Sequence, residues 1–178
     1  MQNAKDSFLV AMRDRLQVLN AARTVEVRGA ERAAVLVAEN ELDGAAVSAQ
    51  GTAVTGVVPE NVPLLDAFVL VWSLLAVDAT EPMALQRMRC EVRYATAGTK
   101  ELSGLDRGRV LAAMDGELRG MLQPAVVAKR SFAGDAAVTM ATNVFWGVAE
   151  FGPAVTVGDR VGRVATVDVF ALTEAGEA

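Results

Sequence analysis

Histidine is absent from the 178-residue sequence, and cysteine occurs once, at Cys90. The first absence removes the side chain that most often moves protons near neutral pH and that most often binds metals. It excludes serine triads, cysteine–histidine pairs and most zinc sites. A single cysteine cannot form an intramolecular disulfide or a thiol-rich metal site, which is typical of cytoplasmic proteins. We therefore predict no enzymatic activity, no catalytic residues, no cofactor and no bound metal.

Long apolar runs are also missing. The most apolar stretch, residues 67–77, spans eleven residues, whereas a helix needs about 20 to cross a bilayer. Residues 1–19 carry charges among their apolar side chains, which does not fit an export signal. Basic residues are in the minority, 17 against 22 acidic ones, so the net charge is -5. We predict a cytoplasmic protein with no membrane partner and no specific nucleic-acid binding.

Apolar residues are abundant. They make up 52% of the sequence, and the mean hydropathy is +0.30, compared with about 45–50% apolar residues in average soluble domains. The length fits a single domain over residues 1–178. The excess of apolar side chains indicates that other subunits cover part of the surface, so we expect a homo-oligomer.

Periodic patterns predict an α+β fold with a mostly antiparallel sheet packed by two amphipathic helices. Apolar residues recur at helical spacing in residues 8–19 and 105–122. Gly108 and Gly116 lie inside the second helix, and we expect them to mark close packing on the sheet. The stretch 68–77 is predicted to be a central strand buried on both faces. Alternating or apolar patterns predict further strands at residues 24–28, 33–38, 87–96, 136–146 and 163–172.

Two segments between these elements are long. Residues 43–63 carry few charges and are bounded by glycine and proline, which predicts a long loop or a weak hairpin. Residues 147–162 alternate briefly and contain a turn signal at Gly158 and Asp159, which predicts a hairpin arm projecting from the body. The glycines of this arm lack the spacing of a nucleotide-binding loop. The tail after Glu174 is expected to be mobile.

The sharpest candidate for a functional site is a row of arginines on one face of the strand at residues 87–96. Arg87, Arg89 and Arg93 alternate with apolar residues, and Glu91 shares their face. One interpretation is a solvated sheet face that Glu91 partly neutralises. The other is a surface that faces a neighbouring subunit or an anion, because arginine forms paired bonds to carboxylate and phosphate.

The start of the second helix offers a weaker candidate. Arg107 and Arg109 lie where helix N-termini bind anions. Ser103 and Asp106, however, have the spacing of a capping box. Asp106 already brings a negative charge to this end, so we interpret the pattern as capping.

Three other groups have plain structural interpretations. Cys90 lies on the apolar face of its strand and is predicted to be an inert core thiol. Glu39, Glu41 and Asp43 could hold a divalent cation, but they lack the glycine-defined loop of such sites, and a solvated strand end is favoured. Core or interface positions are predicted for the aromatic residues Trp72, Phe145 and Trp146.

The order of these elements resembles the tail terminator, or tail completion, proteins of long-tailed bacteriophages and related contractile particles. The resemblance is in pattern, because that family has no invariant signature. Four segments carry it: the helix at residues 8–19, RMRCEVRYAT at 87–96, LDRGRVLAAMDGELRGML at 105–122, and GRVATVDVFALTE at 162–174.

The resemblance implies an α+β subunit of a ring, typically hexameric, that caps the tail tube and joins it to the head–tail connector. It brings no catalytic residues. The two long segments, 43–63 and 147–162, exceed those of the smaller family members, so a neighbouring neck or tail component also fits. The alternative from another class is a small α+β domain that binds an anionic small molecule through Arg87, Arg89 and Arg93. A plain dimeric domain is a third interpretation.

Overall fold

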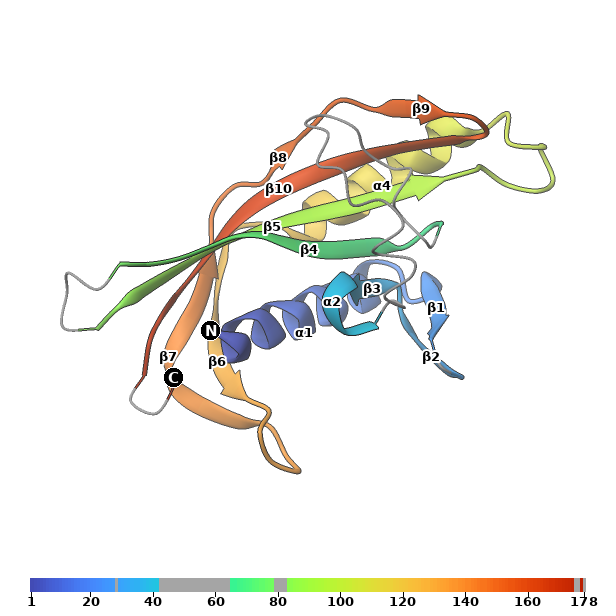
Figure 1. The fold of residues 1–178 in the computed structure, drawn as a ribbon. Helices are drawn as coiled ribbons and strands as arrows, with labels where there is room; N and C mark the ends of the chain where they lie inside the picture. Colours follow the sequence, from blue (N-terminus) through green and yellow to red (C-terminus); the bar gives the residue numbers. More distant parts are fainter. Residues whose placement is uncertain (28, 42–64, 79–82, 175–176, 178) are drawn as a thin grey trace.

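The computed structural model describes residues 1–27, 29–41, 65–78, 83–174 and 177, and its centre is one large sheet (Figure 1). The eight strands of this sheet run in the order β3-β4-β5-β10-β7-β6, with β8 and β9 paired to β10. All of these pairs are antiparallel except β3 with β4. The strands are β3 (Val35–Val37), β4 (Phe68–Asp78), β5 (Leu85–Thr96), β6 (Ala125–Ser131), β7 (Val138–Trp146), β8 (Glu150–Phe151), β9 (Val155–Val157) and β10 (Arg160–Leu172).

Two long helices pack on the same face of the sheet. They are α1 (Gln2–Leu19) and α4 (Arg107–Met121), and they contact each other. Phe8 of α1 is fully buried and packs edge-on against two tryptophans of the sheet, with ring centroids 5.8 Å from Trp72 and 5.1 Å from Trp146. The predicted α+β fold with two amphipathic helices is thus confirmed.

Short elements link α1 to the sheet. β1 (Thr24–Val27) and β2 (Ala30–Ala33) form a separate antiparallel hairpin, and α2 (Ala38–Glu41) is a single turn after β3. The turn of the hairpin contains Gly29, whose φ of +78° suits glycine. The predicted strands at residues 24–28 and 33–38 are confirmed as short strands.

The pairing of β5 with β10 is the longest in the sheet. It joins twelve residue pairs, from Leu85 opposite Leu172 to Thr96 opposite Val161. The predicted alternation of β5 is confirmed: its apolar side chains are buried, at Met88, Cys90, Val92 and Tyr94, and its charged ones lie on the other face, at Arg87, Arg89, Glu91 and Arg93.

The first half of β4 is buried, as predicted, and the second half is exposed. Residues 68–70 are buried and Trp72 nearly so, whereas all six residues of 73–78 are exposed. β3 pairs with β4 only from Phe68 to Leu70, and the contacts of α1 with this strand reach Trp72, which packs against Phe8. β4 is also the second strand of the sheet rather than a central one. The prediction of burial on both faces is therefore wrong beyond Trp72.

The segment 147–162 lies along β10. Its β8 and β9 both pair with β10, and β9 joins β10 through the predicted turn, where Gly158 has a φ of +57°. The turn and the hairpin are confirmed, and their strands continue the sheet beside β10 instead of standing apart from it (Figure 1). The predicted loop at residues 43–63 lies outside the described residues.

The start of α4 differs from the predicted capping box. Asp106 occupies the N-cap position, but its side chain makes no bond to the helix; its Oδ1 accepts a hydrogen bond from the backbone N–H of Thr99 at 2.9 Å. This bond lowers the pKa of Asp106. Ser103 lies in the preceding turn, where its φ is +49°. Asp106 therefore fixes the loop before α4 rather than the first turn of the helix.

The glycines of α4 also correct a prediction. A Cβ added at Gly108 or Gly116 would meet no atom within 4 Å, so neither marks close packing. The close approach is at Gly120, where a Cβ would lie 2.8 Å from Cδ1 of Leu19. The tight contact of α4 is therefore with α1.

Replacing Gly116 by alanine should stabilise the protein. The new methyl group meets open space, and alanine is favoured over glycine inside a helix by about 1 kcal/mol. We expect Gly116→Ala to raise the free energy of unfolding by that amount in urea titrations. As a control, Gly104→Ala should lower it, because Gly104 has a φ of +78° and its Cβ would lie 2.7 Å from the carbonyl oxygen of Ala97. A Gly116→Ala protein no more stable than the parent would contradict the open position of this residue.

Candidate interaction surfaces

The arginine row lies on the face of the sheet opposite the two long helices, and each of its arginines has a carboxylate partner. Arg87 Nη2 donates to Asp168 Oδ2 at 2.5 Å, and Arg89 Nε donates to Asp168 Oδ1 at 2.9 Å. Arg93 Nη2 donates to Glu91 Oε2 at 2.8 Å. The partial neutralisation by Glu91 was predicted from the sequence. Asp168 was missed, because it reaches the row only through the register that places it opposite Arg89.

An open groove of about 470 Å³ runs beside this row. Its charged lining residues are one arginine, Arg89, and three carboxylates, Glu91, Glu150 and Asp168. Hydrogen bonds from Arg89 and then Arg87 lower the pKa of Asp168, so this carboxylate is ionised at neutral pH. The groove therefore offers an anion more negative than positive charge, and its geometry does not favour the anion-binding interpretation.

The other sequence candidates have structural roles. Cys90 is fully buried, and burial raises the pKa of its thiol well above its usual range, as expected of a core residue. Glu39 forms an ion pair with Lys5 at 3.3 Å. The side chain of Glu41 and all of Asp43 lie outside the described residues, and the described part of the chain contains no group of three acidic or cysteine side chains placed to hold a metal.

The three aromatic candidates divide between the two faces of the sheet. Trp72 and Trp146 are core residues, 8% and 3% exposed. Phe145 is 36% exposed and stacks on Phe170, with ring centroids 5.4 Å apart. Phe145 is opposite Val126, which is 67% exposed, and Phe170 lines the groove together with Val148, which is 80% exposed. We call these apolar residues the β6–β7 patch: Val126, Phe145 and Val148, which are exposed, and Phe170, which is partly buried.

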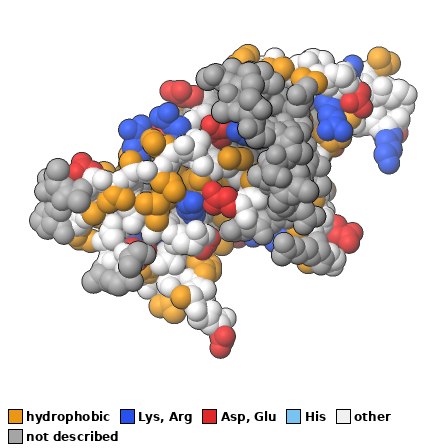
Figure 2. All heavy atoms as spheres, in the orientation of Figure 1, with side chains coloured by type: hydrophobic (Ala, Val, Ile, Leu, Met, Phe, Trp, Pro, Cys, Tyr) orange, Lys and Arg blue, Asp and Glu red, His pale blue; other side chains and the backbone are white. Residues whose placement is uncertain are grey.

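A second apolar surface lies where β4 extends beyond β3. Four large apolar side chains are 38–53% exposed there: Leu74, Leu75 and Val77 of β4, and Met83 just before β5. We call these four residues, together with Ala76, the apolar ribbon. Figure 2 shows hydrophobic side chains gathered over the part of the molecule where β4 and β5 extend. Within the described residues, 71–77 pair with β5 on one side and with no strand on the other. Long apolar edges of this kind pair readily with other chains.

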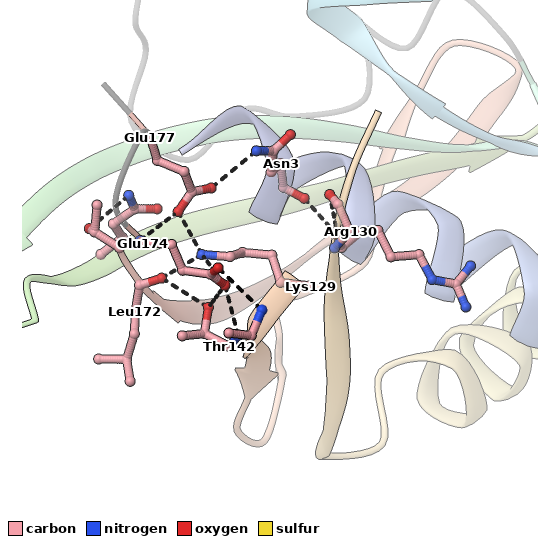
Figure 3. A network of polar contacts seen from close by, with 11 residues as sticks. Asn3, Lys129, Arg130, Thr142, Leu172, Glu174 and Glu177 are labelled. Carbon is pink, nitrogen blue, oxygen red and sulfur yellow. Dashed lines mark hydrogen bonds and ion pairs between the residues drawn. The ribbon is translucent and has the colours of Figure 1, made fainter. Parts of the chain in front are cut away.

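A buried lysine holds the end of the chain (Figure 3). Lys129 of β6 is 0% exposed, and its Nζ donates to the carbonyl of Leu172 and to Glu177, both at 2.6 Å. Glu177 also accepts a bond at 3.2 Å from Asn3 of α1. Glu174 lies 3.6 Å from the same lysine. The expectation that the tail after Glu174 is mobile is wrong for Glu177, because this carboxylate neutralises a buried charge.

β6 itself was missed in the sequence because of this lysine. Its burial pattern alternates, but the position buried most completely is Lys129 instead of an apolar residue. A sequence pattern that treats lysine as an exposed residue cannot place a strand here. The sequence feature that could reveal this strand is the pair of carboxylates, Glu174 and Glu177, that neutralise Lys129 from about 45 residues further along the chain.

No protein-family model matches the chain, and no curated protein matches it. None of the described helices is both long and apolar enough to span a membrane.

The carboxyl group of Glu174 should make the free energy of unfolding depend on pH in the acidic range. Its pKa falls from 4.5 to about 2, chiefly because the hydroxyl of Thr142 donates to it at 2.6 Å. A lowered pKa in the folded state stabilises the protein above the unfolded value, and this contribution is lost as the pH falls from about 4.5 towards 2. We expect Thr142→Val to raise the pKa of Glu174, as measured by NMR titration. Thr156→Val, an exposed threonine on β9, should leave it unchanged; an unshifted pKa in Thr142→Val would contradict the network.

Because Arg87 and Arg89 are paired with Asp168, we predict that phosphate does not stabilise the protein. At constant ionic strength, adding phosphate should leave the thermal midpoint of the parent protein unchanged, because Arg87 and Arg89 already bind Asp168. In Asp168→Asn both arginines lose their charged partner, and phosphate should then raise the midpoint. Asp159→Asn, which changes an exposed aspartate in the β9–β10 turn, is the control. A phosphate-dependent rise in the parent protein would support the anion-binding interpretation instead.

Proposed function

We propose that this chain is a structural subunit of a bacteriophage tail or related contractile particle, of the tail terminator or tail completion type. It forms a homo-oligomeric ring that caps the tail tube and joins it to the head–tail connector. The observation that carries the proposal is the apolar ribbon, whose four large side chains are 38–53% exposed. Leu74, Leu75 and Val77 lie on the part of β4 that has no neighbouring strand on one side in the described structure, and Met83 lies just before β5. A subunit that buries this surface against a neighbour removes apolar side chains from water, which stabilises the assembly relative to the isolated chain.

The charged groups of the open sheet face support a structural role. All three arginines of the row are bound to carboxylates of the same chain, so this face is close to neutral without any ligand. Paired surface charges of this kind contribute little to binding energy. They leave the exposed apolar residues as the main source of affinity for a neighbouring protein.

The net charge of -5 fits the proposed place in the particle. A ring between head and tail surrounds the path of DNA, and a negatively charged subunit repels the phosphate backbone instead of binding it. DNA could pass such a ring without sticking to it. The proposed partners are proteins, namely the tail tube and the head–tail connector, first in the host cytoplasm and then in the assembled particle.

The mass of the assembly in solution tests this proposal. A closed ring of six 18.7-kDa chains would weigh about 112 kDa. We expect light scattering over a range of concentrations to show this mass, or a monomer that converts to it on concentration, and negative-stain images to show rings with a central opening. A monomer or dimer at every concentration would contradict a ring-forming subunit.

A further inference from the structure

We propose that Lys129 and Asn3 join covalently, through an isopeptide bond that Glu177 helps to form. The bond links the first turn of α1 to β6 and releases ammonia. This inference goes beyond the proposed function and does not depend on it, because the reaction takes place once, within a single chain. One carboxylate contacts both reacting side chains, and this arrangement carries the argument (Figure 3).

Lys129 supplies the nucleophile. Its side chain is 0% exposed, and its Nζ lies 2.6 Å from Oε2 of Glu177 and 2.6 Å from the carbonyl oxygen of Leu172. A lysine amine attacks a carbonyl carbon once it has lost its extra proton. Burial holds the amine in one place and keeps water away, so hydrolysis does not compete with the attack.

Glu177 is placed to move the protons. Its side chain is 5% exposed, and its two oxygens bind different nitrogens: Oε2 binds Nζ of Lys129, and Oε1 accepts from Nδ2 of Asn3 at 3.2 Å. Burial acts to raise the pKa of Glu177, but hydrogen bonds from Lys129 and from the backbone N–H of Glu174 help to lower it overall. The carboxylate is therefore ionised at neutral pH and can accept a proton.

Asn3 supplies the carbonyl carbon and the leaving group. It lies in the first turn of α1 and is half-buried, and its amide nitrogen points towards Glu177 (Figure 3). An amide nitrogen leaves only after it gains a proton, and the carboxylate that can deliver this proton is already in contact with it. In the reacting arrangement Cγ of Asn3 approaches Nζ while Nδ2 stays on the carboxylate.

The step balances in atoms and electrons. Glu177 takes one proton from the ammonium group of Lys129, and the electron pair freed on Nζ forms a bond to Cγ of Asn3. Nζ then gives up a second proton, which the carboxyl group passes to Nδ2. The Cγ–Nδ2 bond breaks with its electron pair on the nitrogen, and the departing ammonia takes the remaining proton from Glu177. The products are one amide bond and one ammonium ion, so no oxidant or reductant is needed.

The bond would fasten the helical layer to the sheet. Residues 3 and 129 are far apart in the sequence, and a cross-link that closes a long loop restricts the unfolded chain most. A chain whose single cysteine is buried cannot obtain such a constraint from an intramolecular disulfide. The isopeptide bond provides a covalent link that does not depend on thiols.

The mass of the intact protein tests the proposal. The bond lowers the mass of the chain by about 17 Da, the mass of ammonia. We expect this loss in the parent protein at neutral pH. Trypsin should then release the peptide that ends at Lys5 joined to residues 120–130, because a modified Lys129 resists cleavage. A parent protein that keeps its full mass and yields no joined peptide would overturn the proposal.

Variants isolate the reacting groups, and circular dichroism shows whether each one folds. Asn3→Ala lacks the carbonyl carbon and Glu177→Ala lacks the proton carrier, so both should keep the full mass. Asn20→Ala is the matched control, because Asn20 also donates to a carboxylate, at 2.7 Å, but the other partner of that carboxylate is an arginine. This control should lose ammonia like the parent. A loss of about 18 Da in Asn3→Ala, the mass of water, would show that Lys129 joins a carboxyl group and would contradict the proposal.

Discussion

The antiparallel pairing of β5 with β10 is the constraint on which the rest of the structure depends. Twelve residue pairs fix the register, and the register decides what each face of the sheet carries. On one face it aligns the buried side chains that both long helices cover. On the other it sets Asp168 against Arg87 and Arg89, so that the charges are neutralised within the sheet. A shift by one residue would exchange the two faces and bury the arginines.

The burial of β4 stops where neighbouring elements no longer cover the strand, although its apolar sequence continues. β4 continues after Trp72 with Leu74, Leu75 and Val77, yet its burial ends at Trp72, two residues beyond its pairing with β3 and at the residue that packs against Phe8 of α1. A longer β3 would complete the core and remove the apolar edge. The short β3 leaves the edge available, which is unfavourable for an isolated chain and useful for a subunit that has a neighbour. Burial left incomplete in this way links the fold to the proposed assembly.

Elements that depend on local periodicity could be predicted from the sequence, whereas features that depend on residues far apart in the chain could not. Both long helices, the alternation of β5 and the inert Cys90 follow from periodicity and residue type. β6 was missed because the buried Lys129 is acceptable only beside Glu174 and Glu177. The apolar run at residues 68–77 predicts burial along its whole length, because a continuously apolar strand does not reveal how far its neighbours cover it. The carboxylate opposite Arg89 required the register itself.

The distribution of charge completes the case for a binding role between proteins. The three arginines of the row, Arg87, Arg89 and Arg93, are bound to Asp168 and Glu91. An anion that bound here would have to compete with these existing ion pairs, which costs binding energy. Here the three arginines of the row are paired, whereas the neighbouring side chains of Val126, Phe145 and Val148 remain exposed. The groups of this surface that have no partner within the chain are therefore apolar, which is the kind of surface that the proposed protein partner would cover.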